Sequence, residues 1–68
     1  MIKYYDSTSQ DGHKRIAVVN WFDDEPNNAT SRFGHEIRTL PEGFDEWKEY
    51  DRFGYDDCTI VIMSIRGE

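Results

Sequence analysis

The sequence predicts an α+β domain, in which an antiparallel sheet of three or four strands carries one helix on a face, in the order strand, strand, strand, helix, strand. Short β-branched and aromatic segments separated by turn-forming residues predict the first strands. Aromatic residues at helical spacing after residue 43 predict the helix, and an apolar segment at 59–65 predicts the last strand. With 68 residues, the chain fits one small domain spanning 1–68.

The first two strands are expected to form a hairpin. Residues 2–6 read as a short strand, and 7–12 contain Ser, Thr, Gln, Asp and Gly, with Asp11 and Gly12 at the tightest point of the turn. The second arm is predicted at 13–22, where Ile, Val, Trp and Phe are frequent.

A polar loop and a third strand are predicted next. Residues 23–31 contain Pro26 and two consecutive asparagines, a composition typical of loops. From 33 to 39, Phe33, His35, Ile37 and Thr39 alternate with glycine and charged residues. This period of two indicates a half-buried strand, in which His35 is expected to be a packed, hydrogen-bonded residue.

A helix is predicted from about residue 44 to residue 54. Thr39 and Glu42 have the spacing of a capping box, Gly43 moves the start toward residue 44, and Gly54 is a suitable end. The face that packs on the sheet would comprise Phe44, Trp47 and Tyr50.

The segment 59–65 is apolar on both sides. One face would carry Val61, Met63 and Ile65, and the other Ile60 and Ile62. A strand of this kind is central in a sheet or covered on both faces. Since one helix covers only one face, we expect that a second copy of the chain covers the other, in a homodimer.

The charge of the chain limits its partners. A formal net charge of -6 disfavours direct binding to nucleic acid, whose phosphates attract Lys and Arg, and disfavours anionic membrane surfaces. A cationic protein partner is expected instead.

Acidic residues gather in two places. Residues 41–57 contain seven carboxylates against Lys48 and Arg52, a local net charge of -5, and a second cluster follows the second strand. On the expected helix, acidic residues three or four positions apart would have Cβ atoms roughly 5–6 Å apart. This spacing is close enough to that of DNA phosphates for the carboxylates to engage the same Lys and Arg groups. If both clusters lie on one edge, they form a single strip. The candidate partner-binding residues are Asp23, Asp24, Glu25, Glu42, Asp45, Glu46, Glu49, Asp51, Asp56 and Asp57.

Nothing in the sequence predicts a cofactor, a metal site or an enzyme. His13, His35 and Cys58 lack the spacing of metal ligands, and the acidic neighbours of Cys58 disfavour its thiolate. Asp56 and Asp57 would be the acid and base of a small enzyme, but so short a chain hardly encloses a pocket that excludes water. The basic spot of His13, Lys14 and Arg15 is either a surface cluster beside a turn or a counterpart to an acidic face.

A soluble, cytoplasmic protein is expected. Cys58 is the single cysteine, so no intrachain disulfide forms. The first residues lack the layout of a signal peptide, and the longest apolar run, 60–63, is too short to cross a bilayer.

The short, acidic, aromatic-rich and cysteine-poor composition resembles that of small phage-encoded or mobile-element proteins that disable host DNA-handling machinery by imitating DNA. The resemblance implies an inhibitor, located in the host cytoplasm, that occupies the basic DNA- or RNA-binding cleft of a repair, CRISPR, restriction or nucleoid protein. The alternative is a small dimeric interaction module whose carboxylates serve only solubility. Its apolar binding surface would be centred on the last strand or on Tyr4, Tyr5, Trp21 and Phe22.

Overall fold

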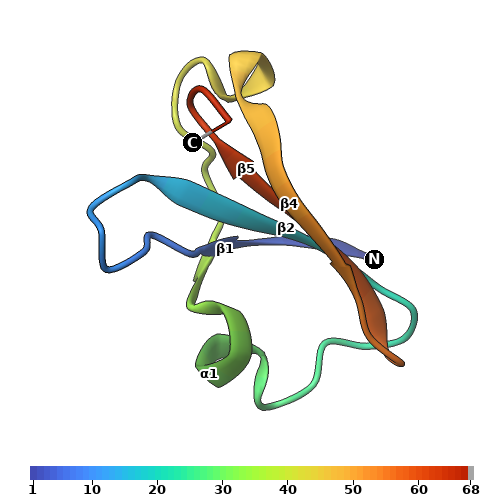
Figure 1. Ribbon diagram of the computed structural model, residues 1–68. Coiled ribbons are helices and arrows are strands. Elements are labelled where there is room, and N and C mark those ends of the chain that lie inside the picture. The colour runs from blue at the N-terminus through green and yellow to red at the C-terminus, as the bar shows by residue number, and fades with distance from the viewer. Residues whose placement is uncertain (68) are drawn as a thin grey trace.

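The computed structural model describes residues 1–67 and shows an α+β fold, an open five-stranded antiparallel sheet with one short helix (Figure 1). The strand order across the sheet is β3-β1-β2-β5-β4. The elements are β1 (Ile2–Asp6), β2 (Arg15–Trp21), α1 (Ala29–Phe33), β3 (His35–Ile37), a 3-10 turn η1 (Phe44–Glu46), β4 (Lys48–Gly54) and β5 (Cys58–Ser64).

Three strands correspond to the sequence prediction. β1 and β2 form the expected antiparallel hairpin, in a register running from Ile2 opposite Asn20 to Asp6 opposite Ile16. β5 lies between β2 and β4, so its backbone is paired on both sides, in agreement with the central position that its apolar sequence indicates.

The predicted helix over 44–54 is wrong. Only η1 is helical, and the chain then becomes extended at Trp47, with φ -66° and ψ 155°, and continues as β4. Gly43, with φ 76°, precedes η1 in the left-handed region that favours glycine. The element order is therefore strand, strand, helix, strand, strand, strand, and residues 1–67 contain no helical stripe of carboxylates.

The main core lies on the face of the sheet that α1 covers. This helix falls largely within the predicted loop, and its Phe33 ring lies with its centroid 5.7 Å from the ring centroids of both Tyr5 and Trp21. Buried apolar side chains hold the sheet and the helix together, because each Å² of apolar surface removed from water contributes roughly 25 cal/mol of stability. They are Tyr5, Ala17, Val19, Trp21, Ala29, Cys58 and Ile60.

The second face of the sheet is only partly covered. After β3, the chain crosses the sheet to reach β4 at the opposite edge (Figure 1). On its way the Phe44 ring packs edge-on against Tyr4, with centroids 6.2 Å apart, and Trp47 packs on Phe44. Ile16 is buried on this face, whereas Ile2 remains 57% exposed.

The two edges of the sheet differ in length. β3 has three residues and pairs only with β1, while β4 has seven and pairs only with β5. Every residue of β4 is exposed. The pairing of β4 with β5 is interrupted by a bulge between Glu49 and Asp51.

Candidate functional site: an acidic end of the sheet

Two acidic turns meet at one end of the sheet. Trp21, the last residue of β2, lies opposite Cys58, the first residue of β5, and the Phe22 N–H donates to the Asp57 carbonyl at 3.1 Å. The loop that follows β2 therefore starts beside the turn between β4 and β5. We call the five carboxylates of these turns the acidic end: Asp23, Asp24, Glu25, Asp56 and Asp57.

The other candidate residues lie elsewhere. Glu42, Asp45 and Glu46 precede β4, whose first residue pairs with the last residue of β5. The seven residues of β4 span roughly 20 Å and separate this group from the acidic end. The single strip that would form if both clusters lay on one edge is therefore not formed, because the segment that was expected to be a helix is extended.

Of the two carboxylates on β4, Glu49 is paired with a cation of the same strand, and Asp51 accepts a hydrogen bond from a backbone N–H. The Arg52 guanidinium donates to Glu49 Oε1 at 2.6 and 3.2 Å, which lowers the pKa of Glu49, and the Arg52 N–H donates to Asp51 Oδ1 at 2.8 Å. Since β4 also contains Lys48 and Arg52, these two carboxylates leave the strand with no formal net charge.

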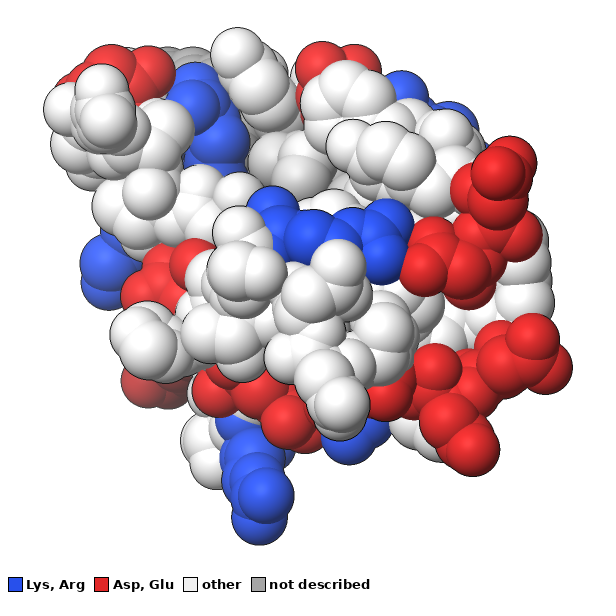
Figure 2. Space-filling model, turned by 90° about the horizontal axis from the view of Figure 1, so that it is seen from below, with Lys and Arg blue, Asp and Glu red and all other residues white. Residues whose placement is uncertain are grey.

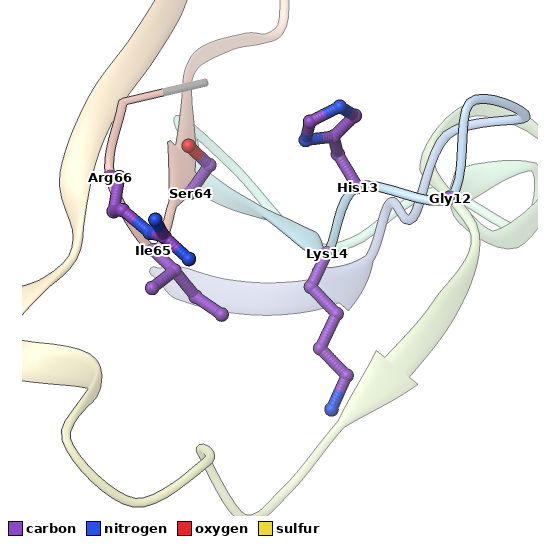
Figure 3. A pocket seen from close by; sticks show the side chains of 6 residues that line it. All are labelled: Gly12, His13, Lys14, Ser64, Ile65 and Arg66. Atoms are coloured by element: carbon purple, nitrogen blue, oxygen red, sulfur yellow. The ribbon is translucent and has the colours of Figure 1, made fainter.

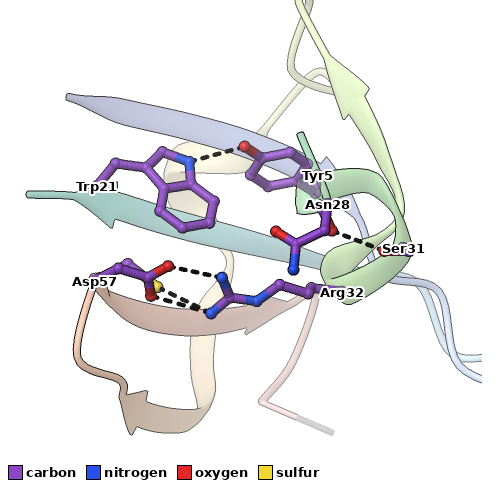
Figure 4. Close-up of polar contacts among 7 residues, drawn as sticks. Tyr5, Trp21, Asn28, Ser31, Arg32 and Asp57 are labelled. Carbon is purple, nitrogen blue, oxygen red and sulfur yellow. Dashed lines mark hydrogen bonds and ion pairs between the residues drawn. The ribbon is translucent and has the colours of Figure 1, made fainter. Parts of the chain in front are cut away.

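Arg32, on α1, fixes the turn between β4 and β5. Its guanidinium donates two hydrogen bonds to the Asp57 carboxylate, at 2.8 and 3.1 Å (Figure 4). The same guanidinium lies 5.3 Å from the Trp21 ring centroid and 5.2 Å from that of Tyr55. The hydrogen bonds from Arg32 lower the pKa of Asp57, so this carboxylate stays ionised.

The loop after β2 is attached through the core. Trp21 Nε1 donates to the Tyr5 hydroxyl at 2.8 Å (Figure 4). That hydroxyl donates to the Glu25 carboxylate. Burial, followed by the bond to Glu25, raises the pKa of Tyr5. The two acidic turns are thus held by Tyr5 of the core and by Arg32 of α1.

Exposed carboxylates and aromatic rings lie together at this end. Asp23, Asp24 and Asp56 are exposed, and among residues 1–67 no Lys or Arg lies within ion-pair distance of them. Phe22 and Tyr55 are 56% and 54% exposed. Figure 2, which views the molecule from below, shows acidic side chains along one side of this end. With Arg32 counted, the acidic end has a net charge of -4.

The basic residues near the first turn do not form a second site. Arg15 is buried, donates to Ser9 Oγ at 2.6 Å and lies over the Tyr50 ring. The hydrogen bond from Ser9 contributes most to lowering the pKa of Asp11 to about 2, and the ion pair between Arg15 and Asp11 also lowers it.

His13 and Lys14 line an open pocket of about 250 Å³ with Gly12, Ser64, Ile65 and Arg66. In Figure 3 the Lys14 side chain extends away from Ser64 and His13. The Ser64 hydroxyl is buried. The polar groups therefore do not converge on a common point where an anion would bind.

The described residues hold no cluster typical of a metal centre. Within 1–67, no three His, Cys, Asp or Glu side chains come together to hold a metal ion. Cys58 is buried, which raises the pKa of its thiol, and the neighbouring Asp57 carboxylate adds to the effect. His35 is exposed on its short edge strand, so the expectation that it is packed is wrong.

Arg32 is the residue of this site that the sequence analysis missed. It lies 25 positions from Asp57 in the chain, between the predicted loop at 23–31 and the strand predicted from 33. No local spacing relates the two residues. The one available signal was that the acidic turns carry an excess of carboxylates, which makes a basic partner from elsewhere in the fold favourable.

Comparisons with protein-family models, with curated proteins and with solved structures find no match for this chain. Within residues 1–67, no helix has the length and apolar character needed to cross a membrane. Function is therefore inferred from the geometry and charge of the acidic end.

Proposed function

We propose that this protein is a non-catalytic binding protein whose acidic end occupies the basic nucleic-acid-binding cleft of a partner protein and excludes the nucleic acid. The observation that supports this most strongly is the meeting of the two acidic turns beside exposed Phe22 and Tyr55. The two turns are far apart in the sequence, and the fold brings them to one end.

Charge spacing supports imitation of phosphates. Neighbouring strands lie roughly 4.8 Å apart, and a DNA strand carries one charge per roughly 3.4 Å of helix axis. Carboxylates on adjacent turns can therefore be spaced similarly to DNA phosphates. Lys and Arg side chains in a nucleic-acid cleft are arranged to bind charges at that spacing. Because Arg32 and Tyr5 hold the turns, binding requires little further ordering.

The aromatic rings would supply the part of the affinity that salt does not screen. Carboxylates accelerate encounter with a basic surface, and this attraction weakens over a Debye length of about 8 Å at physiological ionic strength. Phe22 and Tyr55 have the character of interface anchors, since large rings buried at the centre of an interface often dominate its energy. The partner class is a DNA-repair, CRISPR, restriction or nucleoid protein, and the inhibitor would be encoded by a phage or mobile element.

A second candidate is a small dimeric interaction module whose carboxylates serve solubility. The observation that favours it is the number of large exposed apolar side chains. They include Ile2, Phe22, Tyr50, Phe53 and Tyr55. Tyr5 and Trp21, which were expected in such a surface, are buried in the core and cannot take part.

Affinity capture separates the two candidates. The tagged protein is incubated with bacterial lysate at low and at physiological salt, with and without competing duplex DNA, and retained proteins are identified by mass spectrometry. We expect retention of a nucleic-acid-binding protein that duplex DNA displaces and that salt weakens. Retention that neither DNA nor salt affects would contradict the proposal and favour the apolar module.

A further inference from the structure

We propose that β4 pairs antiparallel with β4 of a second copy, about a two-fold axis, to join the two sheets edge to edge. β4 is the long edge of the sheet, and all of its seven residues are exposed. An edge of this length presents unpaired backbone N–H and C=O groups that favour another strand. This inference is independent of the function proposed above.

The bulge in β4 changes which side chains share a face. Glu49 lies opposite Met63 and Arg52 lies opposite Val61, two residues of β5 that are on the same face of the sheet. The hydrogen bond of 2.6 Å between the two side chains agrees with this. In a regular strand, residues three apart point to opposite faces. The bulge therefore places an acidic and a basic side chain on one face, one on each side of the Tyr50–Asp51 pair.

This arrangement makes the strand complementary to itself. When the axis passes between Tyr50 and Asp51, Glu49 lies opposite Arg52 of the second copy, and Arg52 opposite its Glu49. Lys48 then lies opposite Phe53, so a cation meets an aromatic ring. No like charges face each other between residues 48 and 53, and opposite charges on facing positions stabilise strand pairs.

Registers whose axis passes through residue 49, 50, 51 or 52 do not share this property. An axis at Glu49, Asp51 or Arg52 would place that charge against its own copy. An axis at Tyr50 would place Glu49 opposite Asp51 of the second copy and Lys48 opposite its Arg52. Like charges directly opposite each other destabilise a strand pair.

A second copy fits this edge better than a foreign strand does. Charged residues and bulges on an edge discourage pairing with regular strands. A strand with the same bulge matches the irregular spacing, and the exposed Tyr50 and Phe53 rings would gain contacts across the axis. The same register brings Asp45 and Glu46 near the acidic end of the second copy, so we expect a weak, concentration-dependent dimer.

Complementary charge reversals test the pairing. In Glu49→Arg, an arginine replaces the carboxylate, so that cations oppose each other in a homodimer, and Arg52→Glu places carboxylates against each other. Each variant alone is expected to self-associate at least about tenfold more weakly than the original protein. In an equimolar mixture, however, every facing pair is again of opposite charge, so the two variants should form a heterodimer.

The design separates the proposed pairing from general electrostatics. The two variants have formal net charges of -4 and -8, so overall charge opposes their association. Both also lose the ion pair within the strand, so restored association cannot come from it. The exposed positions Arg38 and Glu42 provide the control, since Arg38→Glu and Glu42→Arg change the same charges away from β4 and should leave the homodimer intact.

Sedimentation equilibrium from micromolar to millimolar concentration measures the association. Hydrogen exchange of the original protein adds a readout that needs no variant, because the β4 amides should become protected as concentration rises. A monomer at all concentrations, unchanged β4 exchange, or variants that stay monomeric when mixed would overturn the proposal. Binding of the β4 edge to an unrelated peptide strand in place of a second copy would also overturn it.

Discussion

Tyr5 connects the core to the acidic end more directly than any other single residue described above. Its ring packs between Trp21 and Phe33, and its hydroxyl accepts from the indole of Trp21 while donating to Glu25. The side chain is fully buried. One phenol therefore satisfies a buried indole donor and positions an acidic residue of the binding surface.

Replacing Tyr5 by phenylalanine should destabilise the fold by about 1–3 kcal/mol, because the buried Trp21 N–H loses its acceptor. Thermal or urea unfolding followed by circular dichroism measures the loss. Tyr4→Phe is the matched control, since the Tyr4 ring contact with Phe44 does not require the hydroxyl. Equal stability of the Tyr5 variant and the original protein would contradict the role assigned to the hydroxyl.

The same hydroxyl predicts a loss of stability at alkaline pH. Burial raises the pKa of Tyr5 above its ordinary value of 10.0, so the folded chain holds this proton more tightly than the unfolded chain. The resulting stability is fully present below pH 10 and is lost as pH rises above it toward the folded pKa. Unfolding free energies between pH 8 and 11, compared for the original protein and Tyr5→Phe, should differ in slope above about pH 10.

At the scale of elements, the segment 44–54 shows how a bulge can imitate a helix in a sequence. Tyr50 lies against Arg15 and Phe53 lies opposite Ile60, so both rings are on the face of the core although they are three residues apart. A regular strand would need a spacing of two or four. The bulge supplies the extra residue. Aromatic residues therefore recur every three positions, at 44, 47, 50 and 53, which is close to the period of an α-helix.

The remaining elements were predictable to different degrees. β1, β2 and β5 have strong β-branched and aromatic patterns, and the sequence predicted their positions to within about two residues. α1 has five residues, too few for a helical period, and Ala29 and Phe33 are stabilised by tertiary packing on the sheet. β3 was expected to be longer, but only three of its residues pair with β1.

Gly34 determines how α1 joins β3. Its φ is 105°, and a Cβ at this position would overlap the carbonyl oxygen of Asp6 in β1. Gly34→Ala should therefore destabilise the protein by more than about 2 kcal/mol, through backbone strain and displacement of β3. Chemical denaturation measures the change.

Gly12→Ala serves as the control for this prediction. Gly12 also has a positive φ, of 83°, but no atom lies within 4 Å of the position of its Cβ. The Gly12→Ala variant should lose only about 1 kcal/mol of stability, the cost of holding alanine at a positive φ. Equal effects at the two glycines would contradict the close approach of α1 and β1 at Gly34.

At the scale of the whole molecule, negative charge is concentrated at both ends of β4. The acidic end combines five carboxylates from two turns, while Glu42, Asp45 and Glu46 lie at the opposite end of the strand. The sequence identified all of these residues as candidates. It could not predict which of them converge, because that depends on whether 44–54 is a helix or a strand and on the register that places Trp21 opposite Cys58.

The two ends provide a direct comparison for the proposed function. Asp23→Asn, Asp24→Asn and Asp56→Asn together remove three exposed charges from the acidic end, and Glu42→Gln, Asp45→Asn and Glu46→Gln remove three from the other end. Both triple variants have a formal net charge of -3. General electrostatic attraction would be reduced to a similar extent in both, so only local recognition distinguishes them.

The measurement that tests the central claim most directly is displacement of labelled duplex DNA from the captured partner. Fluorescence anisotropy of the DNA at physiological salt monitors the displacement. The original protein and the variant at the opposite end should displace the DNA at similar concentrations. The acidic-end variant should need at least about tenfold more, equivalent to about 1.4 kcal/mol of binding free energy. Equal displacement by the two triple variants, or greater loss at the opposite end, would contradict the proposal that the acidic end occupies the cleft.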